Sequence, residues 1–426
     1  MSTLLDDDLK NIWHPFTPVG SDPPIVVTSA KGIYLHTEDG RKIIDGTSSW
    51  WVNIHGHSHP AIAEAIYKQA KELEHVIFAG FTHEPAITLS NNLLSILPAN
   101  QSKIFFSDNG STAVEVALKM AIQYWHNKGT PKRKVVAIEG AYHGDTFGSM
   151  SVGERGMFTE PFANHLFDAE FLPWPDGTND EDVIEKFAKI AVAGDIFAFI
   201  YEPMVQGASG MRMYSQGTFA SLVQVARNAN ILCIADEVFT GFGRTGPWFA
   251  SKYLAGGPDI MALSKGITGG TMALGVTTCT DEVFEAFNSP ELSKTFFHGH
   301  SFTANPIACA SANASFELLM MEECIDNMGM IGEKQYAYAE KVKHHPAIAR
   351  AQALGTILSI EIKTTSATSY GNNLKHDIYK FFLERNILLR PLGNIIYFLP
   401  SYVFTVNEMD IVHNAIDSFL NKLKRD

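Results

Sequence analysis

The chain has 426 residues, of which 46% are hydrophobic and 19% are charged, so its composition excludes a disordered, collagen-like or coiled-coil protein. Its 33 basic and 46 acidic residues give a formal net charge of −13, which excludes a general attraction for nucleic acid or for anionic lipid. Length favours two or three domains. We therefore expect a large globular enzyme.

Cysteine use and the beginning of the chain both indicate a cytoplasmic protein. The four cysteines, Cys233, Cys279, Cys309 and Cys324, have no C-x-x-C spacing, so we expect reduced thiols. Residues Met1–Asp8 have neither the basic nor the long apolar region of a signal peptide. No apolar stretch reaches the length of about 18 residues that crosses a membrane.

Short apolar runs that alternate with helix-length segments predict an α/β protein with a mainly parallel sheet covered on both faces. The runs span residues 104–107, 135–138, 196–201, 231–235 and 260–263. From Ser111 onward the apolar spacing is that of a helix. Ligands of such sheets bind at the carboxyl ends of the strands, so the residues after each run are the candidates for a site.

Polar and aromatic residues follow the first two runs. Gly110 and Ser111 stand where the helix after the first run begins, and a helix N-terminus with a hydroxyl can bind an anion. An ordinary N-cap would explain the same residues. Tyr142, in a glycine-containing loop after the second run, could stack on a planar ligand or simply be buried in a turn.

An acid and a lysine follow two later runs. Asp236 needs a cation, a ligand proton or backbone N–H groups as its partner. Lys265 would have a lowered pKa and act as a nucleophile if it is buried, unless it reaches the surface or forms an ion pair. A phosphate site, an aromatic plane, a carboxylate and a buried lysine together predict pyridoxal phosphate as cofactor.

Two further motifs have alternative explanations. Gly241–Gly246 matches G-x-G-x-x-G, but Pro247 follows at once where a dinucleotide site needs a helix, which leaves Arg244 as a structural or anion contact. The alternating histidines of residues 55–59 could bind zinc, but no cysteine is near, and a packed loop explains them better. We therefore expect no metal.

Over nearly its whole length the chain resembles the class III, fold-type I aminotransferases. The segments that carry this resemblance are Asp236-Glu237-Val238, Gly241–Gly246 and Ser264-Lys265-Gly266. Within that class it is similar to enzymes that transfer an amino group to 8-amino-7-oxononanoate in biotin biosynthesis. The segments typical of that group are Ile12–Thr17, Ser48–Trp51, Tyr142–Gly148, Val205–Tyr214 and Lys265–Met272, and the most specific of them are Trp13-His14-Pro15 and Trp50-Trp51.

The resemblance implies a large domain with a mainly parallel sheet and a smaller α+β domain from both chain ends. Residues 1–60 would contribute to the smaller domain, residues 61–320 would form the pyridoxal-phosphate domain, and residues 321–426 would complete the smaller one. It also implies a homodimer with shared active sites.

The resemblance implies roles for single residues as well. The catalytic residues would be Lys265, Asp236 and Tyr142. The cofactor would be bound by Gly110, Ser111, Tyr142, Asp236, Val238 and Lys265, and by Ser301 of the partner subunit. The substrate would be bound by Trp50, Trp51, Tyr142, Gly299, Arg390 and Tyr397. Core packing is the alternative explanation for Trp50, Trp51 and Tyr397.

The chain departs from the pattern of these relatives at two places. Phe16 stands where relatives that use S-adenosylmethionine often have tyrosine, which keeps lysine open as the amino donor. His300 replaces a proline of the relatives, while Ser301 keeps the hydroxyl that phosphate needs. The alternatives are another ω-aminotransferase for 4-aminobutyrate, ornithine or a diamine, a nicotinamide oxidoreductase, and a non-catalytic binding protein.

Overall fold

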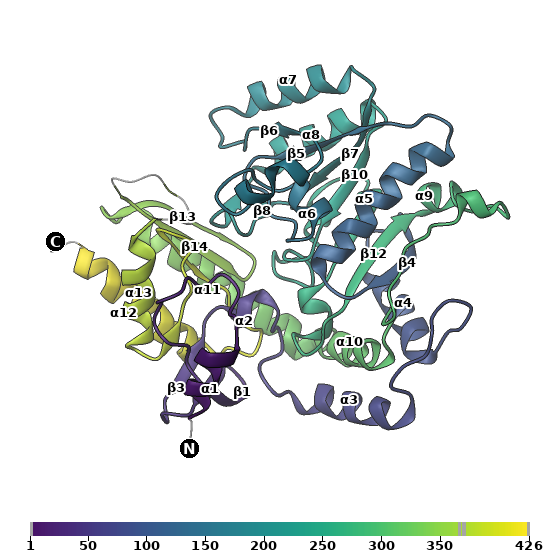
Figure 1. Cartoon of the computed structure of the whole chain (residues 1–426). Helices are drawn as coiled ribbons and strands as arrows, with labels where there is room; N and C mark the ends of the chain where they lie inside the picture. The colour runs from purple at the N-terminus through teal and green to yellow at the C-terminus, as the bar shows by residue number, and fades with distance from the viewer. Residues whose placement is uncertain (1–2, 365–367, 369–371, 424–426) are drawn as a thin grey trace.

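A seven-stranded sheet lies at the centre of the computed structural model, which describes residues 3–364, 368 and 372–423 (Figure 1). Its strand order is β4-β12-β11-β10-β7-β5-β6, and β12 is the one strand that runs antiparallel to its neighbours. The strands are β4 (Gln101–Ser107), β5 (Lys134–Ile138), β6 (Ala169–Leu172), β7 (Ile196–Tyr201), β10 (Leu232–Asp236), β11 (Ile260–Leu263) and β12 (Gly275–Thr280). The mainly parallel sheet predicted from the apolar runs is confirmed.

Helices cover both faces of this sheet. One face packs on α5 (Gly110–Asn127), and side chains such as Ile234 and Ile260 point toward it. Cys233 and Ala235, which alternate with Ile234 along β10, point to the opposite face. The helices on that face are α4 (Glu84–Ile96), α7 (Asp180–Ala191), α8 (Gln216–Asn228) and α10 (Pro306–Leu319). Because both faces are buried, the strands are apolar throughout.

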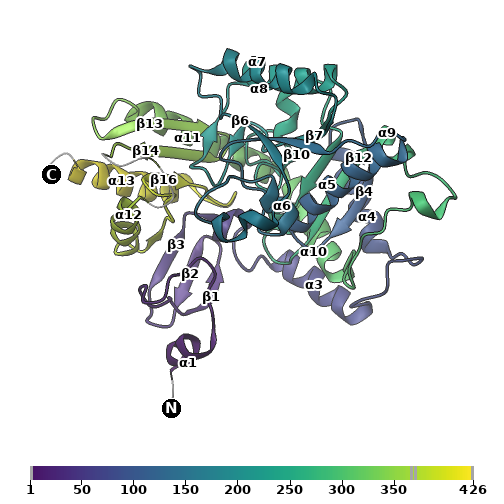
Figure 2. The same ribbon diagram turned by 45° about the horizontal axis from the view of Figure 1, so that its top comes forward.

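The two ends of the chain meet beside the large sheet, as the purple and yellow segments show (Figure 2). The strands β1 (Val27–Lys31), β2 (Tyr34–Thr37) and β3 (Lys42–Asp45) form one sheet with β15 (Ile387–Leu388). A second sheet contains β13 (Ile348–Leu354), β14 (Ile357–Ile362) and β16 (Ile395–Phe398), packed with α11 (Glu322–Val342), α12 (Leu374–Leu383) and α13 (Val406–Leu423). Ile33 and Ile44 belong to the same apolar core as Leu358 and Ile360.

These contacts support the division that the resemblance implied, which we keep as a proposal: residues 1–60 and 321–426 in the smaller unit, and residues 61–320 in the larger. Residues 1–2 and 424–426 of those limits lie outside the described residues.

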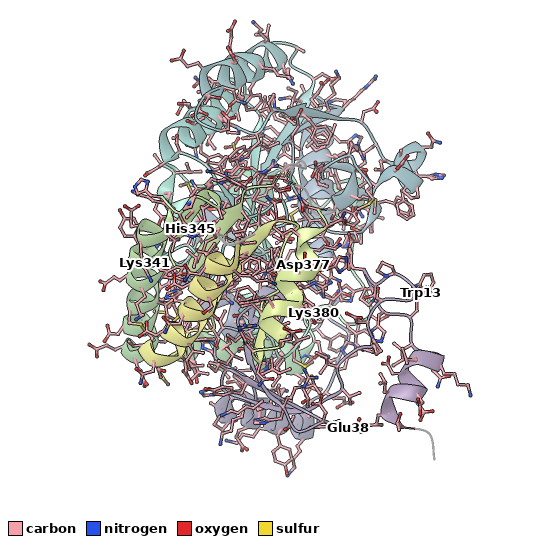
Figure 3. The ribbon with its side chains drawn as sticks, turned by 90° about the vertical axis from the view of Figure 1, so that its left-hand side faces the viewer. Trp13, Glu38, Lys341, His345, Asp377 and Lys380 are labelled. Carbon is pink, nitrogen blue, oxygen red and sulfur yellow. The ribbon has the colours of Figure 1, made fainter. Side chains whose placement is uncertain are left out.

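Further helices and strands connect these parts of the chain. They are α1 (Leu4–Asn11), α2 (Ser48–Trp51), α3 (Pro60–Glu72), α6 (Phe147–Ser151), β8 (Val205–Gln206), β9 (Arg212–Met213) and α9 (Asp281–Glu285). Helix α1 buries none of its residues, and Trp13, which follows it, is 94% exposed and lies away from the body of the chain (Figure 3). Among the described residues, no helix is long and apolar enough to span a bilayer.

Candidate active site

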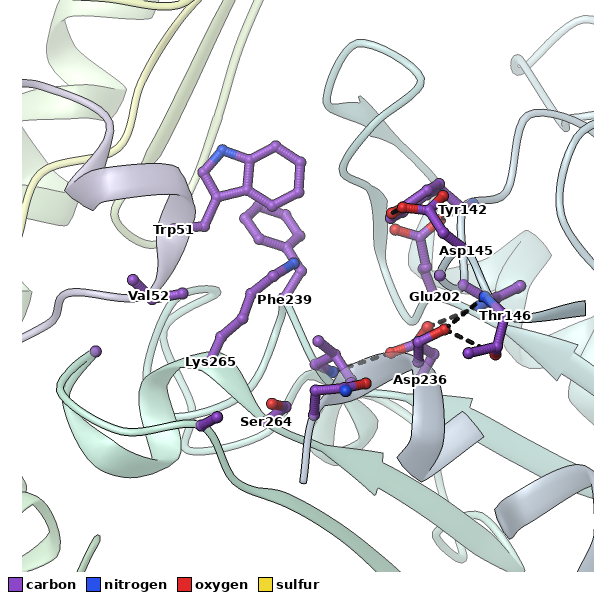
Figure 4. A pocket seen from close by; sticks show the side chains of 18 of the residues that line it. Trp51, Val52, Tyr142, Asp145, Thr146, Glu202, Asp236, Phe239, Ser264 and Lys265 are labelled. Atoms are coloured by element: carbon purple, nitrogen blue, oxygen red, sulfur yellow. Dashed lines mark hydrogen bonds and ion pairs between the residues drawn. The ribbon is translucent and has the colours of Figure 1, made fainter. Parts of the chain in front are cut away.

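A cavity of about 650 Å³ opens at the carboxyl ends of the central strands (Figure 4). Lys265 follows β11, Asp236 ends β10, and Tyr142 follows β5. The start of α5 closes one side of the cavity. The predicted residues that line it are Gly110, Ser111, Tyr142, Asp236, Val238, Lys265 and Trp51. The fold thus brings together the four groups that the sequence placed after separate strands.

Lys265 extends from the base of the cavity toward two aromatic rings (Figure 4). Its Nζ lies 4.4 Å from the centre of the Trp51 ring and 5.6 Å from that of Phe239. Burial lowers the pKa of Lys265 from 10.5 to about 8, although the nearby carboxylates of Asp236 and Glu202 favour the charged form. An amine with this pKa is a nucleophile near neutral pH.

Asp236 lies across the cavity from Lys265 and is 4% exposed. Its Oδ1 accepts the backbone N–H of Val238 at 3.0 Å, and its Oδ2 lies 2.7 Å from Nδ1 of His143. These two contacts fix the carboxylate beside the space that a ligand would occupy. His143 lies in one of the segments that carry the family resemblance, but the sequence did not identify it as the partner of Asp236. The two residues follow or end strands that are distant in the chain.

Glu202 is a second buried carboxylate of the cavity and was not among the residues predicted from the sequence. It accepts the N–H groups of Gly207 at 2.9 Å and of Tyr142 at 3.2 Å. Burial raises its pKa to about 7. Glu202 directly follows β7 as Asp236 ends β10, so the same signal, an acid after an apolar run, was present in the sequence.

The start of α5 is capped and faces the cavity. Asn109 caps the helix by accepting the N–H of Thr112 at 2.9 Å, and Thr112 accepts the N–H of Asn109 in return at 3.1 Å. The N–H groups of Gly110 and Ser111 belong to the first turn, where a helix offers no internal acceptor and its dipole is positive. The Ser111 hydroxyl accepts the backbone N–H of Thr146 at 3.0 Å and lies 2.9 Å from the Thr146 hydroxyl.

Close packing shapes this end of the cavity. A Cβ atom on Gly110 would lie 2.7 Å from Cγ1 of Val238, so only glycine lets that side chain touch the helix start. Gly144 has a φ of +125° and sits against the Ser111 side chain. One cavity is lined by this helix start, the aromatic side chain of Tyr142, Val238, the buried carboxylate of Asp236 and Lys265. The residues present therefore fit pyridoxal phosphate.

A second chamber of about 500 Å³ continues outward and shares Trp51, Tyr142 and Lys265 with the first. Its outer wall contains Phe16 and Trp50, whose ring centres are 5.5 Å apart. Most of the lining surface of this chamber is apolar, which suits a substrate with an apolar chain, and Asp145, Glu154 and Arg212 add charged groups.

The guanidinium of Arg390 lies 4.8 Å above the Trp50 ring and is exposed beside this chamber. Tyr397 is only 1% exposed and packs against Trp51 at a ring distance of 6.1 Å, so it supports that side chain from the core. Gly299 and Ser301 are exposed and line neither chamber of the single chain. Their predicted roles depend on a second subunit.

Side chains of the Gly241–Gly246 loop and of the histidine segment, residues 55–59, form hydrogen bonds within the fold. Arg244, in the Gly241–Gly246 loop, is buried and donates to the carbonyl oxygens of Pro400 at 2.6 Å and Asn53 at 3.2 Å. The next helical turn begins only at Ala250, which does not fit a dinucleotide site.

The histidines of residues 55–59 point to different places. His55 contacts Ser315 at 3.1 Å, His57 contacts Asp45 at 2.9 Å, and His59 caps α3. In the part of the chain that the structure describes, no three histidine, cysteine or acidic side chains are grouped to hold a metal ion.

Known proteins resemble the chain over nearly its whole length. The family model described as aminotransferase class-III matches residues 16–420. A Synechococcus elongatus protein named adenosylmethionine-8-amino-7-oxononanoate aminotransferase is 46% identical over 422 residues, which cover 97% of this chain and 99% of that protein.

Solved structures share the fold. The crystal structure of the enzyme of that name from Methanocaldococcus jannaschii has a TM-score of 0.90 and 32% identity, and covers 97% of this chain and 98% of its own. An amine transaminase of an uncultivated Pseudomonas species, solved with pyridoxal phosphate bound, has a TM-score of 0.91 and 28% identity over 97% and 98% of the two chains. The predicted fold type is confirmed.

Proposed function

The chain belongs to the class-III aminotransferases, and on that premise we propose that it transfers an amino group to 8-amino-7-oxononanoate and so forms 7,8-diaminopelargonic acid in biotin biosynthesis. The cofactor is pyridoxal phosphate. The observation that carries the proposal is the 46% identity, over nearly the full length of both chains, to a relative named for this reaction.

Bound pyridoxal phosphate supplies an electron sink for the carbon that loses its proton. The Lys265 amine binds the cofactor and afterwards moves the proton, for which its lowered pKa suits it. Asp236 holds a proton on the pyridine nitrogen by its negative charge. Trp51 and Phe239 exclude water around Nζ.

The chain's own residues also account for an acceptor with an apolar chain and a carboxylate end. Trp50 and Trp51 line the chamber along which the aliphatic part lies. Arg390, which the Trp50 ring supports, binds the carboxylate through its planar fork. Tyr142 lines both chambers, a position from which it would contact both cofactor and substrate.

We propose S-adenosylmethionine as the amino donor, since relatives similar to this chain are named for it. Phe16 lines the outer chamber and offers no hydroxyl there, so lysine is the alternative donor. We also propose a cytoplasmic homodimer in which Ser301 and Gly299 complete the site of the other subunit.

The direct test is an assay of the purified protein with 8-amino-7-oxononanoate and either S-adenosylmethionine or lysine, with the diamino product measured by mass spectrometry. We expect product with S-adenosylmethionine. Product with lysine but not with S-adenosylmethionine would contradict the proposed donor. If no product forms with either donor, the proposed acceptor is wrong. A reaction of 4-aminobutyrate with a simple keto acid serves as the control for a general ω-aminotransferase.

A further inference from the structure

The segment that carries the two tryptophans is one turn of left-handed helix. Four consecutive non-glycine residues, Ser48, Ser49, Trp50 and Trp51, have φ values of 49°, 45°, 68° and 76°. The N–H of Trp51 donates to the carbonyl oxygen of Thr47 at 2.9 Å, so the turn is closed by a helical hydrogen bond. L-residues avoid this conformation because Cβ approaches the next carbonyl oxygen. Such a turn persists only where its surroundings hold it, and strained segments of this kind cluster at functional sites.

The buried carboxylate of Asp45 holds this turn at its start. Asp45 is 3% exposed and ends β3. Its Oδ1 accepts the backbone N–H and the hydroxyl of Thr47, each at 3.1 Å. Its Oδ2 accepts the hydroxyl of Ser49 at 2.7 Å and lies 2.9 Å from Nε2 of His57. One oxygen of Asp45 therefore accepts hydrogen bonds from the residue that precedes the turn, and the other contacts Ser49 within the turn and the ring of His57.

His57 connects Asp45 with the end of the same turn. Its Nδ1 lies 3.3 Å from the side-chain nitrogen of Asn53, and the backbone N–H of Asn53 donates to the carbonyl oxygen of Ser48 at 3.0 Å. One of the alternating histidines, His57, thus connects Asp45 at the start of the strained turn with Asn53 at its end.

The turn directs its two indoles to different places in the site. Trp51 packs on Phe239 at a ring distance of 4.7 Å and covers the Nζ of Lys265. Trp50 meets Phe16 and supports the guanidinium of Arg390. Loss of the left-handed conformation would move both indoles together, because they are adjacent residues of one turn.

We propose that Asp45 is a positioning residue of the active site: through Thr47, Ser49 and His57 it holds Ser48–Trp51 left-handed, and so places Trp51 against Lys265 and Trp50 beside Arg390. The effect on catalysis rests on the proposed function, while the effect on the turn does not.

The test compares Asp45→Ala with the wild-type enzyme loaded with pyridoxal phosphate. Hydrogen-exchange mass spectrometry should show faster exchange of the peptide that contains residues 47–53. The kcat/KM for the acceptor should fall about ten- to a hundredfold, with KM rising, because small displacements of positioning groups have effects of this size. The pH midpoint of the visible absorbance of the Lys265-bound cofactor should move upward, since water then reaches Nζ. The variant retains Asp236, Glu202 and Arg244, which also act on the pKa of Lys265, and it removes from Arg244 the negative charge of Asp45.

A second substitution separates positioning from general stability. Ser49→Gly in the Asp45→Ala protein should slow the exchange in part and return the absorbance midpoint part of the way to the wild-type value, because glycine removes the steric cost of positive φ at one of the four residues. If Asp45→Ala does not fold, Asp45→Asn keeps the shape of the side chain and allows the same measurements.

Asp259→Asn is the matched control. Asp259 is a half-buried carboxylate, and it accepts the N–H of Cys233 at 2.7 Å where β10 and β11 begin, at the end of the sheet opposite the site. It should lower Tm without changing the exchange of residues 47–53, the absorbance midpoint or KM. If Asp45→Ala lowers only Tm, as this control does, or if Ser49→Gly restores nothing, the proposal is wrong. If the wild-type enzyme lacks the proposed activity, the exchange and absorbance measurements still decide the role of Asp45.

Discussion

At the scale of single residues, the site depends on a buried lysine, Lys265, whose amine can still react. Lys265 has a φ of 46° and stands against two aromatic rings, and its pKa falls to about 8. Compared with a lysine of pKa 10.5, its neutral fraction at pH 7 is a few hundred times larger. Left-handed residues also have a cost, about 1–2 kcal/mol each, which the contacts of Asp45 must offset.

The pKa of Lys265 predicts the pH dependence of cofactor binding by the apoprotein. Only the neutral amine attacks the aldehyde of pyridoxal phosphate, and its fraction grows as pH rises toward the pKa. The rate of recombination, followed by the visible absorbance, should therefore rise about tenfold per pH unit below pH 8 and level off above it. A recombination rate that keeps rising up to pH 10 would mean that Lys265 has the pKa of an ordinary lysine, and would contradict this prediction.

At the scale of elements, the start of α5 depends on a single glycine. Ala at position 110 would bring its Cβ to 2.7 Å from Val238, so the helix start or the valine must move. We expect Gly110→Ala to weaken pyridoxal-phosphate binding by about 1–3 kcal/mol, the usual cost of overpacking, measured as Kd by fluorescence titration.

Gly217→Ala is the control for this prediction. Gly217 also lies in the first turn of a helix, α8, and a Cβ there would meet no atom within 4 Å. This variant should keep the wild-type Kd. Equal cofactor binding by Gly110→Ala and the wild-type enzyme would contradict the packing described at the start of α5.

The sequence predicted those elements whose apolar pattern is continuous. The runs at 196–201 and 260–263 coincide with β7 and β11, because strands buried on both faces contain little else. It missed β12, whose threonines suggest a polar segment. Their hydroxyls are bonded inside the fold, as Thr277 is to the carbonyl oxygen of Ala113 at 2.8 Å.

The sequence could not predict the left-handed conformation of the turn, nor which side chains from distant segments contact each other in the fold. The residues of the turn Ser48–Trp51 are not glycines, so nothing in their identity indicates positive φ. Likewise, the pairing of His143 with Asp236 follows from the order of strands in the sheet. Lys265 and Asp236 were identifiable because each ends or follows an apolar run.

At the scale of the whole molecule, the single chain lacks groups that the proposed site needs. Ser301 and Gly299 are exposed and outside both chambers, although the cofactor and substrate roles proposed for them require contact. A two-fold symmetric pair of chains, in which each subunit supplies these residues to the other, would complete both sites.

Subunit mixing tests this arrangement. Ser301→Asp should place a negative charge against the phosphate and prevent cofactor binding, and Lys265→Ala should abolish turnover. Neither homodimer should be active. After subunit exchange, half of the dimers are mixed and each has one intact site, so about a quarter of the wild-type activity should return. No recovery in a mixture that has exchanged subunits would contradict shared sites.

Lys265 is the centre of the whole account, and one measurement tests its role directly. The wild-type enzyme and Lys265→Ala are each incubated with pyridoxal phosphate, reduced with borohydride, digested and analysed by mass spectrometry, and turnover is measured on the unreduced samples. We predict that the cofactor is fixed to the peptide containing residue 265 in the wild-type enzyme, and that Lys265→Ala shows neither fixed cofactor nor turnover. Turnover by Lys265→Ala, or cofactor fixed to a different lysine in the wild-type enzyme, would contradict the account.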